Sequence, residues 1–197
     1  PGSFILVDQF IDRTFAREKS FFGNGLVAHV SMAEPVCGRV GDLVKLAAGV
    51  AGMPLRTGGT YLAMEGPQFS TQAESHLYRS WGCDVIGMTN MPEAKLAREA
   101  EICYASVAMV TDYDCWNTDH GNVEVVDIIR VLNDNAERAK RLVFSMAELF
   151  LESKHPCDKG CDRVLDTALI TAPGARDPGL VAQLDAVAGR VLGGDNE

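Results

Sequence analysis

Four short runs of apolar residues predict buried β-strands. Each run is continuous rather than alternating, as expected for strands in a sheet that is covered on both faces. The runs span residues 4–10, 60–64, 84–88 and 103–111. Between them lie stretches with helical character, at about residues 39–51, 71–81 and 92–100. Strands that alternate with helices of this length indicate an α/β domain.

The last third of the chain is predicted to be mainly helical. Apolar residues recur at spacings of three and four from Val125 to Phe150, which predicts one long amphipathic helix. A helix laid across the sheet is favoured over a coiled coil. The polar residues that follow include Pro156 and Gly160 and predict a break in the helix. A final helix is expected to begin with the cap Asp177.

This pattern divides the chain into two parts. We expect residues 1–152 to belong to the α/β domain and residues 153–197 to form a helical tail packed on that domain. The chain enters the apolar run at Phe4 almost at once and has no initiator Met. We therefore expect Pro1 to be an internal position of a longer protein.

The charge balance argues against a polyanionic partner. The 197 residues include 18 Lys and Arg against 27 Asp and Glu, which gives a formal charge of −9. Nucleic acids are held mainly by clustered Lys and Arg, so no nucleic-acid partner is expected. No apolar run reaches the roughly 18 residues of a membrane span, so no membrane partner is expected either. We expect a cytoplasmic protein.

Six cysteines raise the question of disulfides and metal sites. Four of them, Cys37, Cys83, Cys103 and Cys115, are scattered through apolar stretches in the manner of reduced core thiols. Cys157 and Cys161 lie close to His155, but this CxxxC has no second pair at metal-site spacing. A structural metal or a disulfide there is an alternative, and a plain loop is the favoured interpretation. We expect no metal and no cofactor.

Two predicted strands are followed by loops that suit ligand binding, because ligands in α/β sheets bind at the carboxyl ends of strands. The strand at 60–64 is followed by a tight turn at Gly66 and Pro67, which holds Phe69 on a rigid loop. The strand at 84–88 is followed by Thr89, whose hydroxyl precedes a helix N-terminus, a place where anions bind.

A pair of carboxylates follows the strand at 103–111. Asp112 and Asp114 would point to the same side if the extended conformation continues. A partly buried Asp beside another acid can have a raised pKa and donate a proton at neutral pH. The alternative is a pair of capping residues on a solvated turn. The pattern leaves the two interpretations open.

At these same residues the sequence resembles a known family. The segments that carry the resemblance are FILVDQFIDRT at 4–14, HVSMAEP at 29–35, GPQFSTQAES at 66–75, MTNMPE at 88–93 and ASVAMVTDYDCW at 105–116. They resemble purine nucleoside phosphorylases of the type that cleaves S-methyl-5'-thioadenosine. The resemblance runs to about Phe150 and fades after Lys154. It implies a mixed α/β sheet flanked by helices, with N-terminal strands outside this chain, and a homotrimer.

The resemblance also implies an activity. Inorganic phosphate would attack C1' of the nucleoside and release adenine and 5-methylthioribose 1-phosphate. Phosphate is a co-substrate, and no cofactor is implied. Asp112 would hold the 6-amino group and protonate N7, with support from Asp114. A proton on the base and a phosphate dianion beside the sugar would stabilise the charges that develop as the glycosidic bond breaks.

The remaining roles implied by the resemblance are binding roles. Phe69 would pack on the purine, Met88 would lie under the ribose, and Thr89 would donate to phosphate. Ser70 and Thr111 would line the base. The wall around the methylthio group would consist of Val123, Val125 and Ile128. His29 would reach the neighbouring subunit's pocket, and its alternative is a structural histidine.

Two departures from the family's pattern limit these expectations. Gly87 stands where the resembled animal enzymes have Asn before the Met-Thr pair. The family's N-terminal Gly-rich loop and Arg-His element, which grip phosphate, have no counterpart here. We therefore expect little activity from the chain alone.

Three alternatives to this activity stay open. A phosphorylase for 6-oxopurines, including 5'-methylthioinosine, is disfavoured by Asp at position 112, because a 6-oxo base favours an amide. A non-catalytic fragment or interaction module is the alternative from another class. A nucleoside hydrolase, which would act without phosphate, is the third.

Overall fold

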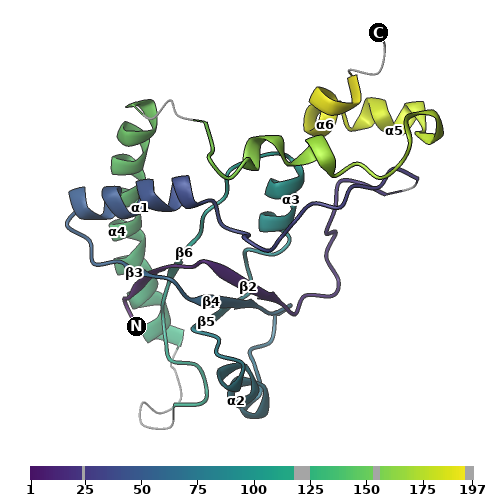
Figure 1. The fold of residues 1–197 in the computed structure, drawn as a ribbon. Helices are drawn as coiled ribbons and strands as arrows, with labels where there is room; N and C mark the ends of the chain where they lie inside the picture. Colours follow the sequence, from purple (N-terminus) through teal and green to yellow (C-terminus); the bar gives the residue numbers. More distant parts are fainter. Residues whose placement is uncertain (24, 118–124, 153–155, 194–197) are drawn as a thin grey trace.

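The computed structural model describes residues 1–23, 25–117, 125–152 and 156–193, which form a mixed α/β body and a helical extension (Figure 1). The apolar run at the start of the chain forms two successive strands, β1 (Phe4–Leu6) and β2 (Gln9–Asp12). Each strand belongs to a different three-stranded sheet. The run therefore crosses both sheets and joins them.

The two sheets have different strand directions. In the first, β1 pairs in parallel with β3 (Arg56–Thr57) and antiparallel with β6 (Val107–Met109). In the second, β2, β4 (Thr60–Ala63) and β5 (Val85–Gly87) all pair in parallel. The predicted mixed α/β architecture is confirmed, although the two-residue β3 was not predicted and the run at 103–111 contributes only three strand residues.

The helices confirm the predicted periodicity to within about two residues. They are α1 (Gly38–Val50), α2 (Gln72–Ser80), α3 (Glu93–Glu99) and α4 (Val125–Glu152). Thr71 caps α2 in a capping box, because its hydroxyl accepts from the Glu74 N–H and the Glu74 carboxylate accepts from Thr71. The long helix α4 packs on α1, and Leu142 of α4 is buried with Phe4 of β1.

The C-terminal extension consists of short helices. They are η2 (Cys161–Thr167), η3 (Pro173–Ala175), α5 (Pro178–Gln183) and α6 (Asp185–Leu192). Asp177 caps α5 as predicted, by accepting from the Leu180 N–H at 2.8 Å. The predicted single final helix is wrong, since the chain turns at Leu184 and begins a second helix.

The extension packs on an earlier part of the chain. Leu165 and Ala188 are buried with Leu26, and an isolated β-bridge joins Ala28 to Leu169. In Figure 1 the extension, coloured light green to yellow, lies beside α3 at the upper right. The division into parts at residues 152 and 153 stays a prediction.

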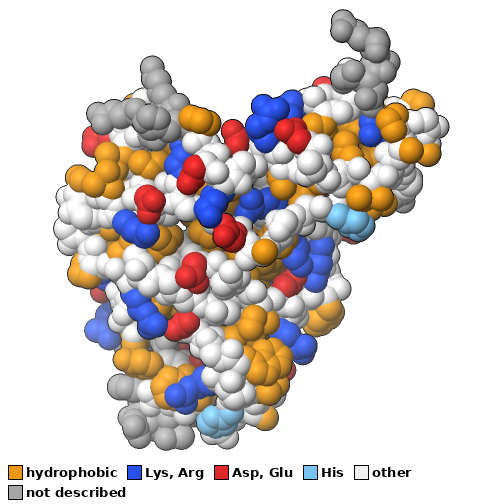
Figure 2. Space-filling view, in the orientation of Figure 1, with side chains coloured by type: hydrophobic (Ala, Val, Ile, Leu, Met, Phe, Trp, Pro, Cys, Tyr) orange, Lys and Arg blue, Asp and Glu red, His pale blue; other side chains and the backbone are white. Residues whose placement is uncertain are grey.

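The surface carries mixed charges. On the face shown in Figure 2, acidic and basic side chains are interspersed rather than gathered into a patch of one sign. Within the described ranges, no helix is long and apolar enough to cross a membrane.

Candidate active site

A cavity of about 610 Å³ lies between β5 and β6. Its walls are residues of these two strands and of the loops after them, the side of α2, and the first residues of the chain. Among the described strands, β5 pairs only with β4 and β6 only with β1. The unpaired edges of both strands therefore line the same space.

The two strands run in opposite directions along the cavity. After β5, the side-chain oxygen of Asn90 accepts hydrogen bonds from Tyr104 at 2.8 Å and Ser106 at 2.7 Å, just before β6. At the other end, Arg79 of α2 stacks on Trp116, which follows β6, at 3.7 Å from the ring centre. The sequence predicts chemistry at the carboxyl ends of both strands, and the structure places these ends at opposite ends of one cavity.

Met88 and Thr89 line the cavity after β5. The Thr89 hydroxyl lies 3.1 Å from the Tyr61 hydroxyl, which reaches across from β4. A Cβ at Gly87 would overlap this Tyr61 hydroxyl. The departure at position 87 thus has a physical reason, because the tyrosine takes the space that a longer residue would need.

The turn after β4 is fitted closely to Met88. Gly66 has φ +72°, and a Cβ there would lie 2.5 Å from the Met88 sulfur. Glycine is therefore required twice over, for the positive φ and for the close approach. The structure confirms the predicted tight turn and shows that it positions Met88.

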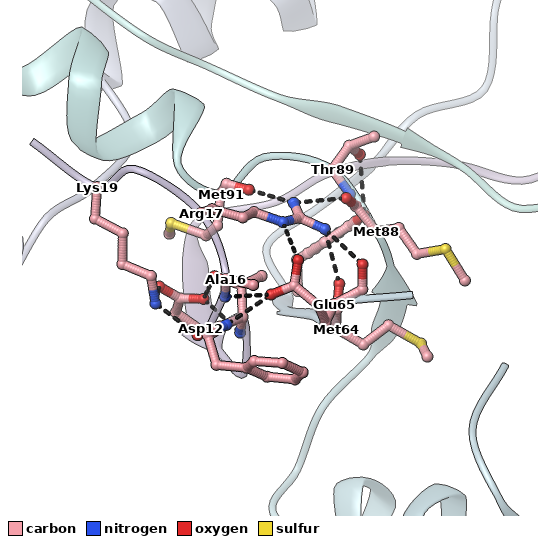
Figure 3. A network of polar contacts seen from close by, with 12 residues as sticks. Asp12, Ala16, Arg17, Lys19, Met64, Glu65, Met88, Thr89 and Met91 are labelled. Carbon is pink, nitrogen blue, oxygen red and sulfur yellow. Dashed lines mark hydrogen bonds and ion pairs between the residues drawn. The ribbon is translucent and has the colours of Figure 1, made fainter. Parts of the chain in front are cut away.

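Arg17 fixes the two loops relative to each other (Figure 3). Its guanidinium donates to the carbonyl oxygens of Met64 and Glu65 after β4, and to those of Met88 and Met91 after β5. Its Nε also donates to the Glu65 carboxylate at 3.0 Å. The cavity residue Met88 is thus held by a side chain that does not line the cavity itself.

The Glu65 carboxylate completes this network by binding Arg17 and the backbone just before it. The backbone N–H groups of Phe15 and Ala16 and the Arg17 guanidinium all donate to its carboxylate and lower the pKa of Glu65 to about 2. The neighbouring Asp12 is partly buried, which by itself raises its pKa. Hydrogen bonds from Lys95, Thr14 and Lys19 outweigh burial and hold the pKa of Asp12 well below its usual range. Both acids are ionised, structural groups at neutral pH.

Asp112 and Asp114 lie at the opposite end of the cavity and both line it. The Asp112 carboxylate accepts from the Thr111 hydroxyl at 2.7 Å and from the Asp114 N–H at 2.9 Å. The Asp114 carboxylate accepts from Ser75 of α2 at 2.6 Å and from the Cys115 N–H at 2.8 Å. Asp114 has φ +60°, so the extended conformation does not continue through the pair. The condition under which the two carboxylates were expected to point to the same side is therefore not met; both nevertheless line the cavity, and local hydrogen bonds orient each one.

The structure does not place every predicted residue in the cavity. Met88, Thr89, Thr111, Asp112 and Asp114 line it, whereas Phe69, Ser70 and His29 do not. Phe69 is 77% exposed on its loop. The Ser70 carbonyl accepts from the Cys115 thiol at 3.5 Å. The loop that carries Phe69 and Ser70 therefore lies beside the loop at residues 111–115, called here the aspartate loop. His29 is exposed near the C-terminal extension, where its backbone N–H donates to the Ala168 carbonyl at 2.8 Å.

The predicted apolar wall cannot be placed. Val123 lies outside the described residues, and so do the side chains of Val125 and Ile128 in the first turn of α4. Their role stays a prediction.

Sequence reasoning missed three residues that shape the site. These are Arg17, Tyr61 and Ser75, which hold Met88, Thr89 and Asp114 respectively. Their roles follow from contacts across 28 or more residues of chain, which local patterns do not reveal. The available signals were that Ser75 ends the resembled segment at 66–75 and that Arg17 follows shortly after the one ending at Thr14.

Comparison with known proteins identifies relatives of the chain. Its sequence is 64% identical to the S-methyl-5'-thioadenosine phosphorylase of Cereibacter sphaeroides, over 98% of this chain and 67% of the relative. The phosphorylase of the same name from Bradyrhizobium diazoefficiens gives the same identity and the same coverage. The chain thus spans about two thirds of the length of these relatives.

Solved structures share the fold. A methylthioadenosine phosphorylase from an antarctic soil metagenomic library superposes with a TM-score of 0.88 at 42% identity, over 95% of this chain and 66% of that one. The methylthioadenosine phosphorylase from Schistosoma mansoni, solved with adenine, gives 0.78 at 28% identity, over 86% of this chain and 67% of that one. The profile of the phosphorylase superfamily matches residues 1–148. The chain therefore belongs to the phosphorylase superfamily.

Proposed function

We propose that this chain supplies the nucleoside-binding part of an S-methyl-5'-thioadenosine phosphorylase, a pentosyltransferase of purine and methionine salvage. The observation that carries the proposal is the cavity between β5 and β6, which has Thr89 near one end and Asp112 near the other. A nucleoside has two chemically distinct ends. Its sugar is attacked by phosphate, and its base is the leaving group, so each end needs its own side chains. The relatives that share 64% of the sequence carry the name of this activity.

Asp112 is the proposed general acid. As the bond between C1' and N9 breaks, its electron pair moves onto the base, and a proton from the Asp112 carboxyl to N7 lets adenine leave neutral. An oxygen of phosphate forms the new bond to C1' and gives 5-methylthioribose 1-phosphate. The hydrogen bonds from Thr111 and Asp114 fix the orientation of the carboxyl group for this transfer. Asp114 has a supporting role in this proposal, because Ser75 holds its carboxylate in place.

Thr89 is the proposed phosphate contact within this chain. Its hydroxyl already pairs with Tyr61, which can accept from Thr89 or donate to it, so Thr89 is free to donate toward an anion while Tyr61 donates to it. Met88 packs beside it and offers an apolar surface to the ribose. Inorganic phosphate is the co-substrate, and the proposed chemistry uses no cofactor.

The other binding roles rest on the resemblance. Phe69 and Ser70 are proposed to close over the base, because their loop contacts the aspartate loop through Cys115. The methylthio group is proposed to meet Val123, Val125 and Ile128. An apolar wall favours a thioether over a hydroxyl, which would lose hydrogen bonds there.

A homotrimer and a cytoplasmic location complete the proposal. His29 lies outside the cavity of its own chain, so its proposed contact is with the pocket of a neighbouring subunit. The large apolar side chains Val126, Val143 and Phe144 are exposed on α4 and support a further protein contact.

The proposal is tested by adenine release from S-methyl-5'-thioadenosine, with and without phosphate. Two proteins are assayed: the chain alone, and the chain joined to the third of the Cereibacter sphaeroides relative that it does not span. We expect phosphate-dependent release from the joined protein and little from the chain alone. Release without phosphate would indicate a hydrolase, and preference for 5'-methylthioinosine would indicate a 6-oxopurine enzyme. A folded joined protein with neither activity would support the non-catalytic alternative.

A further inference from the structure

Four of the six cysteines converge on one point away from the cavity. Cys37 precedes α1, Cys103 lies between α3 and β6, and Cys157 and Cys161 follow α4. Their four sulfur atoms all lie within 4.8 Å of one another, and those of Cys37 and Cys157 are 3.6 Å apart. None of the four lines the cavity between β5 and β6.

This spacing matches a tetrahedral metal site. Four thiolates at about 2.3 Å from a central zinc ion place neighbouring sulfurs about 3.8 Å apart. The separation of Cys157 and Cys161 by three residues also falls within the range of ligand pairs in structural zinc sites. A disulfide would need two sulfurs at about 2 Å, whereas the sulfurs of Cys37 and Cys157 are 3.6 Å apart and all four cysteines are free.

The surroundings suit a closed site rather than a reactive one. Cys37, Cys157 and Cys161 are buried, and Cys103 is half-buried. Apolar side chains pack around the group, including Leu6, Val40 and Val44. Such a shell excludes water and leaves no open coordination position for a substrate.

Two arginines supply the charge that such a site needs. Zinc with four thiolates carries a net charge of −2. The buried Arg98 places Nη1 3.3 Å from the Cys161 sulfur. Arg39 interacts with Cys103, and its buried Nε has no hydrogen-bond partner among the described residues. An anionic centre accounts for two guanidinium groups directed at a cluster of thiols.

The backbone between Cys157 and Cys161 is shaped like a metal-binding turn. Gly160 has φ +66° and its N–H donates to the Cys157 carbonyl at 3.0 Å. The N–H groups of Lys159 and Cys161 are directed at the Cys157 sulfur. Backbone N–H groups in this position stabilise a metal-bound thiolate.

We propose that Cys37, Cys103, Cys157 and Cys161 bind one structural zinc ion. Binding replaces four thiol protons, which are released to solvent, with four zinc–sulfur bonds. The ion ties the segment that follows α4 to the start of α1 and to the segment before β6. It replaces the plain loop expected from the CxxxC and the expectation that no metal is bound. The proposal does not depend on the phosphorylase activity.

The first test is the metal content of the chain, purified under reducing conditions without chelator, by elemental analysis. We expect one zinc per chain in the unsubstituted protein and in the control Cys83→Ser, which alters a cysteine outside the cluster. We expect Cys37→Ser, Cys103→Ser, Cys157→Ser and Cys161→Ser each to lose most of it. One iron per chain, or no stoichiometric metal after exposure to zinc, would overturn the proposal.

The second test keeps the proposal falsifiable if the variants fail to fold. In the native, unsubstituted protein, the four thiols should resist alkylation until a chelator is added, and the mass should show no disulfide. Exchange with Co²⁺ should give the intense d–d absorption of a tetrahedral thiolate site. Four thiols that alkylate at the same rate with and without chelator, or a disulfide among them, would overturn it.

Discussion

Two polar clusters lie in the loops of this structure, one around Arg17 and one around Asp112. They differ in how many of their hydrogen-bonding positions are filled by the chain itself. The Arg17 guanidinium has five N–H donors, and five hydrogen bonds to the chain occupy it. The Asp112 carboxylate accepts two hydrogen bonds from the chain and lines an open cavity. A carboxylate offers about four acceptor positions, so Asp112 keeps capacity for a ligand. Ionisable residues thus form a structural clamp around Arg17 and a binding site around Asp112.

The difference predicts a separation of effects. Changes at the Asp112 end of the cavity should reduce chemistry with little effect on folding, because the carboxylate is not fully used by the chain. Changes at Arg17 or Glu65 should reduce stability first and activity only through the position of Met88. The predictions below refer to the joined protein described above, from the largest expected effect to the smallest.

Asp112→Asn should give the largest loss. The substitution removes a transferable proton but keeps the size of the side chain and its hydrogen-bonding ability. We expect kcat/KM for S-methyl-5'-thioadenosine to fall by about 10²-fold or more, the usual scale for a positioned general acid. The melting temperature should stay nearly unchanged. A large fall in melting temperature would place Asp112 with the structural clamp instead.

His29→Ala should weaken substrate binding across the subunit contact. We expect a loss on the order of 1–3 kcal/mol, visible as a higher KM, if the ring packs in a neighbour's pocket. The control is the melting temperature of the same variant. An unchanged KM with an unchanged melting temperature would return His29 to a structural role on the surface.

Glu65→Gln should lower the melting temperature by a few degrees at neutral pH. Because the folded protein lowers the pKa of Glu65 to about 2, the carboxylate contributes stability above its ordinary pKa near 4.5. That contribution is lost as the pH falls toward 2. The difference in melting temperature between the two proteins should therefore shrink from pH 5 toward pH 2. A difference that stays constant over this range would show that the charge of Glu65 is not what holds the loops.

Tyr61→Phe should give the smallest effect. It removes two neutral hydrogen bonds to Thr89, one with its hydroxyl at 3.1 Å and one from its backbone N–H at 3.4 Å, each worth about 0.5–1.5 kcal/mol at most. We expect a modest rise in the KM for phosphate and little change in the KM for the nucleoside, because Thr89 is the proposed phosphate contact. Equal changes in both constants would show that Tyr61 acts on the cavity as a whole.

The sequence predicted local features well and long-range ones poorly. The helix α2, the long helix α4 and the turn at Gly66 follow from periodicity and turn chemistry over a few residues. The antiparallel direction of β6 could not be predicted, since pairing with β1 joins residues about 100 positions apart. The same limit hid the clamp at Arg17, which acts on residues 47 to 74 positions away.

The cysteines show this limit most clearly. The spacing of Cys157 and Cys161 lacked a second pair in the sequence, so a plain loop was favoured. The fold provides that second pair from Cys37, at the start of α1, and Cys103, before β6. These two are 66 residues apart and have no spacing that sequence reasoning recognises as a ligand pair.

The central claim is that Asp112 recognises and protonates a 6-amino purine. The most direct test is the ratio of kcat/KM for S-methyl-5'-thioadenosine to that for 5'-methylthioinosine, measured in the unsubstituted joined protein and in Asp112→Asn. An amide at position 112 can donate to a 6-oxo base and cannot supply a proton to N7. We predict that the ratio falls by at least ~10-fold in the variant, as the preference moves toward the inosine-type substrate. An unaltered ratio, whatever the absolute rates, would contradict the role of Asp112 in base recognition.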